Sequence, residues 1–403
     1  MNTTFGPADI LLPAGIRSTW PVIACDQYSS DKGYWAEIER QVGGDPSTLR
    51  MIIPEAYLGE IDVQREAAAR SAAMAAYLEQ GVFRTYRNAF VYVERQVTGE
   101  KLRRGLVGAI DLEAYEYTAG TQAPIRASEN TIISRLPPRV QVRRSAPIEL
   151  PHVMVLIDDA EKKFIESVAQ YKYSMPMAYD LQLMGGGGHI AGWLVIGQQA
   201  QRLQEIWDTF AGRDVQIVIG DGNHSLAAAK AWWDELKTTL TPEQRRSHPA
   251  RFALVEMNNV YDSGIEFEPI HRVVFDTQPE RLLNALEAAA GAQSGRKLRW
   301  VSGGRQGEIA LRGDSLGSFI AAFQETLDAY LAENAGTVDY IHDDSAALEF
   351  AKQDGAIAFI MPQMEKADLF KTVASNGVFP KKSFSIGHAR DKRYYLECRR
   401  IAD

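Results

Sequence analysis

The segment VQIVIGDGNHSLAAAKAWWDELK, residues 215–237, constrains the fold more than any other part of the chain. Its β-branched residues favour a strand that runs directly into a short polar turn, and an alanine-rich amphipathic helix follows at once. Gly222 permits the tight turn, and Asn223 or Ser225 is expected to cap the helix. A strand, a turn and a helix in immediate succession indicate an α/β protein.

The turn Asp221-Gly222-Asn223-His224 also suggests chemistry. The start of a helix presents free backbone N–H groups and a partial positive charge, which suit a phosphate or a carboxylate. Asp221 and His224 would lie at the rim of such a site, placed for metal binding or proton transfer. Equally, Asp221 and Asn223 could simply form the turn, with His224 as a satisfied polar side chain. The segment alone leaves both interpretations open.

Composition narrows the class of protein. The 403 residues are 45% hydrophobic and 24% charged, as in a globular protein with two or three domains. The net charge is −8 and no basic tract occurs, so nucleic acid is not the expected partner. No secretory signal and no membrane-spanning apolar run stand out, and two cysteines make no disulfide framework. A cytoplasmic location away from membranes is therefore expected.

Along residues 1–277 the pattern mixes short strands and helices. Residues Glu60–Gln80 are expected to form a surface helix, and Asn88–Val97 a strand that pairs with Arg104–Leu112. Residues Ala123–Pro151 are polar, punctuated by proline and rich in arginine. They are long for a loop without secondary structure, and such loops in compact domains are often functional. We expect this region to be the core domain with an N-terminal elaboration.

Residues 278–403 change to a clean alternation of helix and strand. Helices are expected at residues 280–290 and 318–333, and strands at 308–311 and 356–360. The sequence therefore predicts a second, C-terminal α/β domain with a boundary near residue 277, and mixed sheets of the α+β kind overall. The strand-like tail within residues 382–401 is expected to return to an earlier sheet.

Several known site motifs do not fit. The turn has the first two glycines of a dinucleotide fingerprint, but Ser225 replaces the third, and no G-K-[S/T] follows as a Walker motif requires. The seven histidines include no pair spaced for metal ligation on one helix face. A hard cation such as Mg²⁺ could still bind through carboxylates and a substrate phosphate. Cys25 has no flanking base that would make it a nucleophile.

An arginine-rich stretch precedes the polar turn at residues 221–224. Taken alone, these arginines could simply be solvated surface charges. Together with the turn, they favour an anionic small-molecule ligand, because guanidinium groups suit phosphates and carboxylates. They are Arg126, Arg135, Arg139, Arg143 and Arg144.

Five short elements, taken together, resemble the prokaryotic family called domain of unknown function 1015. The D-G-H-H-R signature of that family corresponds to Asp221-Gly222-Asn223-His224-Ser225. Its H-E-x-T element is echoed by Ser128-Glu129-Asn130-Thr131, and its P-T-H-R element by Pro269-Ile270-His271-Arg272. Its P-Q-K-S-T element resembles Pro380-Lys381-Lys382-Ser383-Phe384, and its P-Y-D element falls at Ala24-Cys25-Asp26. The elements occur in the family's order and cover most of the chain.

The family signature is in turn similar to the G-x-H-R turn of ParB-type domains, sulfiredoxins and free-serine kinases. The resemblance implies a ParB/sulfiredoxin-like nucleotide-binding core whose turn binds nucleotide phosphates. Three departures occur here. Asn223 occupies the sulfiredoxin cysteine position, which rules out chemistry that needs a thiolate; Ser225 replaces the phosphate-binding arginine, and Ser128 replaces the leading histidine.

The resemblance implies a phosphotransferase that acts on a small hydroxylated metabolite, with ATP, ADP or pyrophosphate as donor and with Mg²⁺ as a candidate cofactor. A nucleotide- or metabolite-binding regulator without turnover is the alternative. The implied catalytic residues are Glu129, Asp221 and His224. The implied phosphate- and substrate-binding residues, which we expect to converge with them on one cleft, are Asp26, Arg126, Thr131, Gly222, Asn223, Ser225, His271, Arg272, Lys382 and Ser383.

Overall fold

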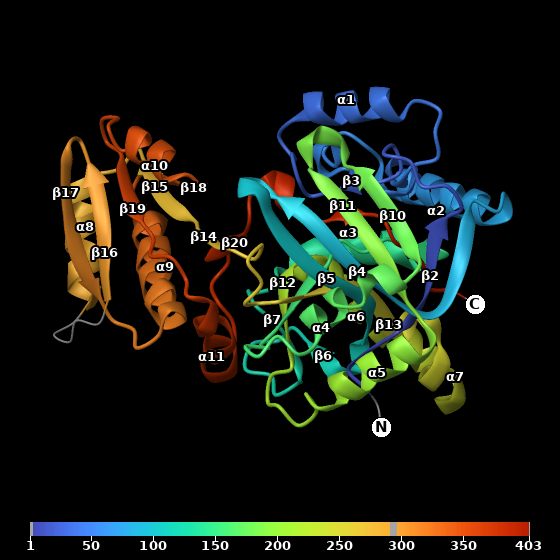
Figure 1. Ribbon diagram of the computed structural model, residues 1–403. Coiled ribbons are helices and arrows are strands. Elements are labelled where there is room, and N and C mark those ends of the chain that lie inside the picture. The colour runs from blue at the N-terminus through green and yellow to red at the C-terminus, as the bar shows by residue number, and fades with distance from the viewer. Residues whose placement is uncertain (1–2, 291–295, 403) are drawn as a thin grey trace. The chain divides into compact units, whose positions relative to one another are not determined.

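The computed structural model describes residues 3–290 and 296–402, and it has a mixed α/β fold (Figure 1). The chain divides into two compact units. The first comprises Met1–Ala127, Thr131–Ile265 and Gly387–Asp403, and the second comprises Ser128–Asn130 and Glu266–Ile386. The sequence boundary near residue 277 thus differs from the structural one at residue 266, because residues 267–275 pair with strands of the second unit.

A large mixed sheet forms the centre of the first unit. Its strands follow the order β10-β11-β4-β5-β13-β9-β12-β7-β6, with β1 added to β5 and β2 added to β4. Most neighbours are antiparallel, but β12 and β7, β13 and β9, and β6 and β7 are parallel. The strands are β1 (Phe5–Gly6), β2 (Ala8–Pro13), β4 (Phe83–Val97), β5 (Lys101–Asp111), β6 (Tyr115–Glu116), β7 (Ile125–Ala127), β9 (Met154–Ile157), β10 (Met177–Gln182), β11 (His189–Val195), β12 (Ile217–Asp221) and β13 (Phe252–Asn259).

Both faces of this sheet are buried. Alternate side chains of β4 enter two different hydrophobic clusters: Val91 and Val93 join one, whereas Phe90 and Tyr92 join the other. The first cluster is covered by α1 (Lys32–Val42) and α2 (Val63–Glu79), and the second by α4 (Ile165–Ala169), α5 (Gly197–Asp208) and α6 (Asn223–Leu236). The short helix α7 (Pro242–Ser247) follows α6. The first unit therefore has helices on both sides of the sheet.

Most expected elements of the first unit are confirmed. Asp62 caps α2 by accepting hydrogen bonds from the N–H groups of Gln64 and Arg65, and β4 pairs with β5 in antiparallel register. The expectation of a long irregular loop at residues 123–151 was wrong. That segment contains β7, α3 (Leu136–Ser145) and β8 (Ile148–Glu149). Prolines in the first turn of α3 start the helix rather than prevent it, because their missing N–H groups would have no partner there.

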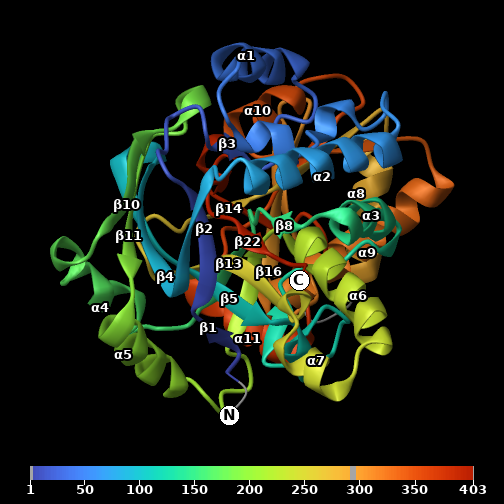
Figure 2. The same cartoon turned by 90° about the vertical axis from the view of Figure 1, so that its right-hand side faces the viewer.

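Helices α3 and α6 lie side by side (Figure 2). Leu136 and Val140 of α3 pack against Ala227 and Ala228 of α6. The small alanine side chains let the two helices approach closely. This contact fixes α3 beside the helix that follows the polar turn.

The C-terminal tail belongs to the first unit. Its strand β21 (Tyr394–Tyr395) pairs with β3 (Val22–Ile23), and β22 (Arg399–Arg400) pairs with β8. The indole N–H of Trp20 donates to the carbonyl of Leu396 at 2.9 Å. The tail therefore places residues from the end of the chain beside β3 and β8.

The second unit is built on another antiparallel sheet with the order β17-β16-β19-β15-β18. Phe323 of α9 packs against Phe359 of β19, whereas α10 packs against the neighbouring Ala358, so the two helices cover opposite faces. Strands β14 and β20 form a separate pair. The elements are β14 (Phe267–Pro269), β15 (His271–Phe275), α8 (Pro279–Ala290), β16 (Arg296–Ser302), β17 (Arg305–Leu311), α9 (Leu316–Glu333), β18 (Thr337–Ile341), α10 (Asp344–Phe350), β19 (Ile357–Ile360), α11 (Lys366–Asn376) and β20 (Phe384–Ile386).

Candidate functional site

The polar turn joins the end of β12 to the start of α6. Gly222 has a φ of 82°, in the left-handed region, and a β-carbon there would lie 3.1 Å from the Cα of Val153. Glycine is therefore required at this position by conformation and by space. The expected capping by Asn223 or Ser225 was wrong, because Gly222 is the cap residue and no side chain caps α6. Side-chain capping therefore plays no part at the start of α6.

Opposite charges meet at the turn. One carboxylate oxygen of Asp221 accepts a hydrogen bond from the N–H of Gly222 at 2.9 Å. The other lies 3.3 Å from the ammonium group of Lys392, which arrives with the C-terminal tail. Lys392 was not among the residues expected from the sequence, because no local pattern connects position 392 with position 221.

His224 is held in one neutral tautomer. Its Nε2 accepts a hydrogen bond from the backbone N–H of Ile132 at 3.1 Å, so the ring proton resides on Nδ1. Burial lowers the pKa of His224 to about 4, and the positive charges of Arg139 and Arg135 act in the same direction, whereas Asp26 opposes them. Near neutral pH the imidazole is thus an uncharged hydrogen-bond donor rather than a cation.

Ser225 begins a chain of polar contacts. Its hydroxyl oxygen lies 3.3 Å from Nε2 of His152, and Nδ1 of His152 lies 3.0 Å from the hydroxyl oxygen of Tyr395. That tyrosine oxygen also accepts a hydrogen bond from the N–H of Cys25 at 3.2 Å. His152 and Tyr395 were missed from the sequence, because only the fold brings residues 25, 152, 225 and 395 together.

Asp26 adds a further negative charge that acts on His224. Burial alone would raise the pKa of its carboxyl group, but the charges of His152 and Lys392 and a hydrogen bond from Gln27 outweigh burial and hold the pKa below its usual range. Cys25 beside it is inert, because burial, followed by the charge of Asp26, raises the pKa of its thiol to about 12. The thiol is therefore protonated at neutral pH.

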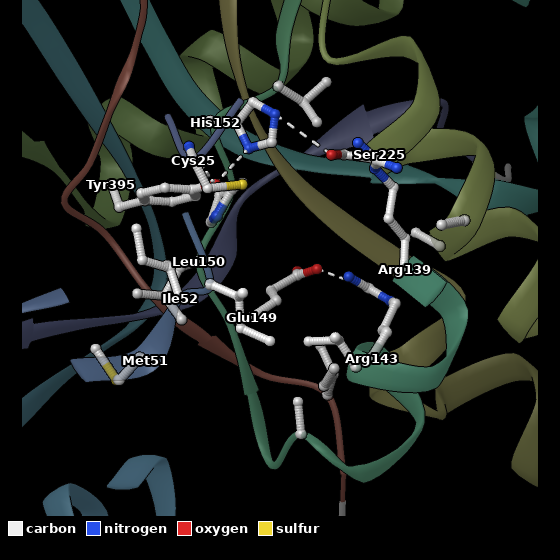
Figure 3. Close-up of a pocket in the computed structure, with 18 of the residues that line it drawn as sticks. Cys25, Met51, Ile52, Arg139, Arg143, Glu149, Leu150, His152, Ser225 and Tyr395 are labelled. Atoms are coloured by element: carbon white, nitrogen blue, oxygen red, sulfur yellow. Dashed lines mark hydrogen bonds and ion pairs between the residues drawn. The ribbon is translucent and has the colours of Figure 1, made fainter. Parts of the chain in front are cut away.

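A cavity of about 200 Å³ lies next to the turn (Figure 3). Ser225 and Leu226 of α6 contribute to its wall, as does Val153, the residue that contacts Gly222. The labelled apolar side chains Met51, Ile52 and Leu150 face its interior, as Figure 3 shows. Its polar lining residues are Cys25, Glu55, Arg139, Arg143, Glu149, His152, Ser225 and Tyr395.

Arg126 and Thr131, also expected at the site, have different surroundings. The guanidinium group of Arg126 is buried and donates to the carbonyl of Ala123 at 2.7 Å and to the carboxylate of Asp214 at 2.6 Å. Asp214 precedes β12, whereas the polar turn follows it, so this guanidinium is directed toward the opposite end of the strand. The hydroxyl of Thr131 is buried and has no hydrogen-bond partner within residues 3–290 and 296–402.

Glu129 belongs to the second unit. Its carboxylate accepts hydrogen bonds from the backbone N–H groups of Lys382 at 3.3 Å and Ser383 at 3.1 Å. Burial raises the pKa of Glu129 to about 7, although these N–H groups and the charge of Lys382 oppose that change. Lys382 has a φ of 61°, so a left-handed turn presents the two donors. A carboxyl group that titrates near neutral pH is suited to proton transfer.

Arg272 and His271 lie in β15 of the same unit. Arg272 is fully buried and donates from Nε to Gln324 at 3.1 Å, whereas Nη2 has no hydrogen-bond partner within the described part of the chain. Burial lowers its pKa to about 10, although the charges of Tyr340 and Glu129 oppose this. In His271, Nδ1 accepts from the N–H of Met361 at 3.1 Å and Nε2 lies 2.7 Å from Asp344. Both ring nitrogens of His271 are thus engaged within the protein.

Apart from Arg126 and Thr131, whose surroundings differ, the residues expected at one cleft fall into two groups. In the first unit, Asp26, Ser225 and the turn residues lie together with Lys392 and His152. In the second unit, Glu129 and Arg272 interact electrostatically, and Glu129 also binds Lys382 and Ser383. Convergence of the two groups stays a prediction.

Within residues 3–290 and 296–402, no three or more histidine, cysteine, aspartate or glutamate side chains are grouped so that they could hold a metal ion. Of the helices in the same residues, none is both long and apolar enough to cross a membrane.

Comparison with known proteins gives weak structural similarities and one family match. No curated protein matches the sequence. A free serine kinase variant in complex with ADP is 11% identical with a TM-score of 0.41, covering 76% of this chain and 95% of that one. A conserved hypothetical protein from Pyrococcus furiosus is 12% identical with a TM-score of 0.35, covering 72% of this chain and 90% of that one. The model of the family described as "Protein of unknown function (DUF1015)" matches residues 11–378, and the chain therefore belongs to that family.

Proposed function

We propose that this protein is a phosphotransferase that moves a phosphoryl group from a nucleotide or pyrophosphate to the hydroxyl of a small metabolite. The observation that carries the proposal is the start of α6, which follows a left-handed glycine and has no side-chain cap. Backbone N–H groups at a helix start attract phosphate oxygens, and the helix dipole adds to the attraction. Lys392 and the Nδ1–H of His224 supply further positive or donor groups beside the turn.

The chemistry requires an anion site, charge neutralisation and a proton acceptor. The acceptor hydroxyl oxygen forms a bond to phosphorus while the bond to the donor's bridging oxygen breaks, and the leaving phosphate takes up the negative charge. In this proposal the backbone of Gly222, Asn223 and His224 holds the donor phosphates, and the N–H of Gly222 exchanges its bond to the Asp221 carboxylate for one to a phosphate oxygen. A phosphate oxygen would compete for Lys392 and release Asp221 from its ion pair, so that Asp221 can accept the hydroxyl proton.

The residues at the turn could supply only part of the ligands that Mg²⁺ requires. Asp221 is the carboxylate at the turn that could contact Mg²⁺, and the remaining ligands would come from substrate phosphates and water. A bound Mg²⁺ would neutralise charge on the transferred group.

In this proposal Glu129 helps to orient the hydroxyl, and Arg272 and Lys382 neutralise the charge that develops on the transferred group. The pKa of about 7 at Glu129 supports a part in proton transfer. The proposal also keeps the first unit as a ParB/sulfiredoxin-like nucleotide-binding core.

A regulator that binds a nucleotide or an anionic metabolite without turnover is the second candidate. This candidate is favoured because Asp221 and His224, the two ionisable residues of the turn, already have partners within the protein. Asp221 is paired with Lys392, and the acceptor nitrogen of His224 already binds the N–H of Ile132. A binding protein needs no free base.

Thermal unfolding in the presence of ATP, ADP or pyrophosphate, each with and without Mg²⁺, tests ligand binding. A ligand at one hundred times its Kd should add about 2.7 kcal/mol to the free energy of unfolding. Lys392→Met should weaken this stabilisation, whereas Lys297→Met, at an exposed position in β16, should not. Phosphorus NMR with a pool of hydroxylated acceptors then separates the two candidates. No stabilisation by any donor would contradict the phosphotransferase and a nucleotide-binding regulator.

A further inference from the structure

The cavity beside the turn is a half-open pocket rather than an enclosed void in the core. This cavity has about 200 Å³, and its wall includes aliphatic side chains such as Met51, Ile52 and Leu150. An apolar cavity of about 150 Å³ can take up benzene, so this one has room for a hydrocarbon of roughly six to eight carbons. The shape and chemistry of the wall therefore suit an aliphatic ligand.

The charged groups in the wall are already paired. Arg139 forms an ion pair with Glu55, and Arg143 lies 2.6 Å from Glu149. Glu149 also pairs with Arg399 at 2.8 Å. Because each of these charges is matched within the protein, a ligand needs no net charge to enter. The paired charges favour a neutral head group over a carboxylate or an ammonium.

The remaining polar groups of the wall lie near the turn. Ser225 is the third residue of α6, and its hydroxyl lies 3.3 Å from His152 (Figure 3). Both residues line the cavity, and the Ser225 hydroxyl can donate to or accept from a ligand hydroxyl, whereas both ring nitrogens of His152 already have partners in the protein. Val153 lines the cavity and also contacts Gly222, so the cavity and the turn share a wall residue. A ligand that fills the cavity can therefore place its hydroxyl beside the phosphate-binding turn.

From this juxtaposition we infer that the cavity binds the acceptor, and that the acceptor is a neutral aliphatic alcohol of about six to eight carbons. The alkyl chain lies among the aliphatic side chains, and the hydroxyl is held by Ser225, whose own hydroxyl is oriented by His152. This inference rests on the proposed phosphotransferase function for the role of acceptor. It excludes small polar alcohols as preferred acceptors, because they would leave the apolar wall unfilled.

Isothermal titration calorimetry of the full chain with 1-butanol, 1-hexanol and 1-octanol tests the cavity without any phosphoryl donor. Burial of one methylene group contributes about 0.8 kcal/mol, so affinity should rise about fourfold for each added carbon. The increase should end once the cavity is full. Equal affinity for all three alcohols, or no binding of any of them, would overturn the inference.

Two variants change the size of the cavity. Ala146→Leu puts a larger side chain into the wall and makes the cavity smaller, so the alcohol that binds best should have a shorter chain. Ala72→Leu, at an exposed position on α2, should leave the preference unchanged. Met51→Ala enlarges the cavity and should move the preference toward longer chains, which keeps the test available if Ala146→Leu fails to fold. An unchanged chain-length preference in a folded size variant counts against this cavity as the binding site.

Separate measurements distinguish this inference from the proposed function. If the alcohols bind with the expected chain-length dependence but no donor stabilises the protein, the cavity assignment holds and phosphoryl transfer fails. If pyrophosphate or ATP binds and phosphorylates glycerol as readily as 1-hexanol, the proposed function holds and the acceptor assignment fails. Faster phosphorylation of 1-hexanol than of glycerol, lost in Ala146→Leu, supports both.

Discussion

The protonation of His224 offers a direct test of the turn. Its imidazole should titrate near pH 4, because burial and the charges of Arg139 and Arg135 disfavour the protonated ring. Bound pyrophosphate would place negative charge beside the Nδ1–H group. Opposite charges at close range typically change a pKa by about one to three units, so the ligand should raise the pKa of His224 by at least about one unit.

The lowered pKa also predicts how stability depends on pH. The folded pKa of about 4 lies below the ordinary value of 6.5, so the unfolded chain takes up the proton first as the pH falls. The contribution of His224 to the free energy of unfolding is therefore fully present above about pH 6.5, and it is lost progressively as the pH falls to about 4. A fully buried ring would give about 3.4 kcal/mol at 1.36 kcal/mol per pKa unit. His224 is partly exposed, and solvent screening reduces the expected loss to about 1–2 kcal/mol.

NMR of the histidine Cε1–H signals measures this pKa. The chain has seven histidines, and His224→Gln identifies the signal of interest by removing it. His189, an exposed histidine paired with Asp180, is the internal control and should not respond to pyrophosphate. The same variant should lose less stability than the wild type between pH 6.5 and pH 4. A His224 midpoint near 6.5 in the free protein would refute the neutral-donor description of the turn, and an unchanged midpoint with saturating pyrophosphate would refute the anion site.

Three further outcomes are expected. Gly222→Ala should lower the free energy of unfolding by about 1–3 kcal/mol, because the alanine would have a left-handed φ and its β-carbon would lie close to Val153. Gly212 has a similar φ of 84° but open space around it, so Gly212→Ala should lower the free energy of unfolding by less. Any activity that needs ionised Glu129 should rise as the pH increases through about 7, and Glu129→Gln should abolish that dependence in a pH–rate profile. If Asp221 accepts the proton, Asp221→Asn should unfold at nearly the same temperature as the wild type, yet its turnover should fall by ~10²-fold or more. An unchanged rate would mean that Asp221 only forms the turn.

The sequence by itself determined the local elements. Period-2 and period-3.6 patterns predicted α2, β4, β5 and the strand–turn–helix of β12 and α6, because the burial of each element follows from its own residues. Gly222 could be assigned to the turn because few other residues adopt its backbone conformation. The family elements pointed to Glu129, Lys382 and Ser383, and the structure connects these three by hydrogen bonds.

The sequence misled where a local pattern had two physical meanings. Prolines within residues 123–151 indicated a loop, but proline at the first helical positions is compatible with a helix, and α3 forms there. Asn223 and Ser225 are good capping residues, yet Gly222 takes the cap position in the structure. Packing against α6, rather than local propensity, selects the helical alternative for α3.

Only the tertiary structure decided the surroundings of the site. Lys392, Tyr395 and His152 reach the turn region through strand pairing of the tail and the order of the large sheet, over separations of more than 70 residues. The cavity likewise arises from side chains of several separate elements. Spacing along the chain carries no information about such contacts, and burial, which sets the pKa values of His224 and Glu129, exists only once the chain has excluded water around them.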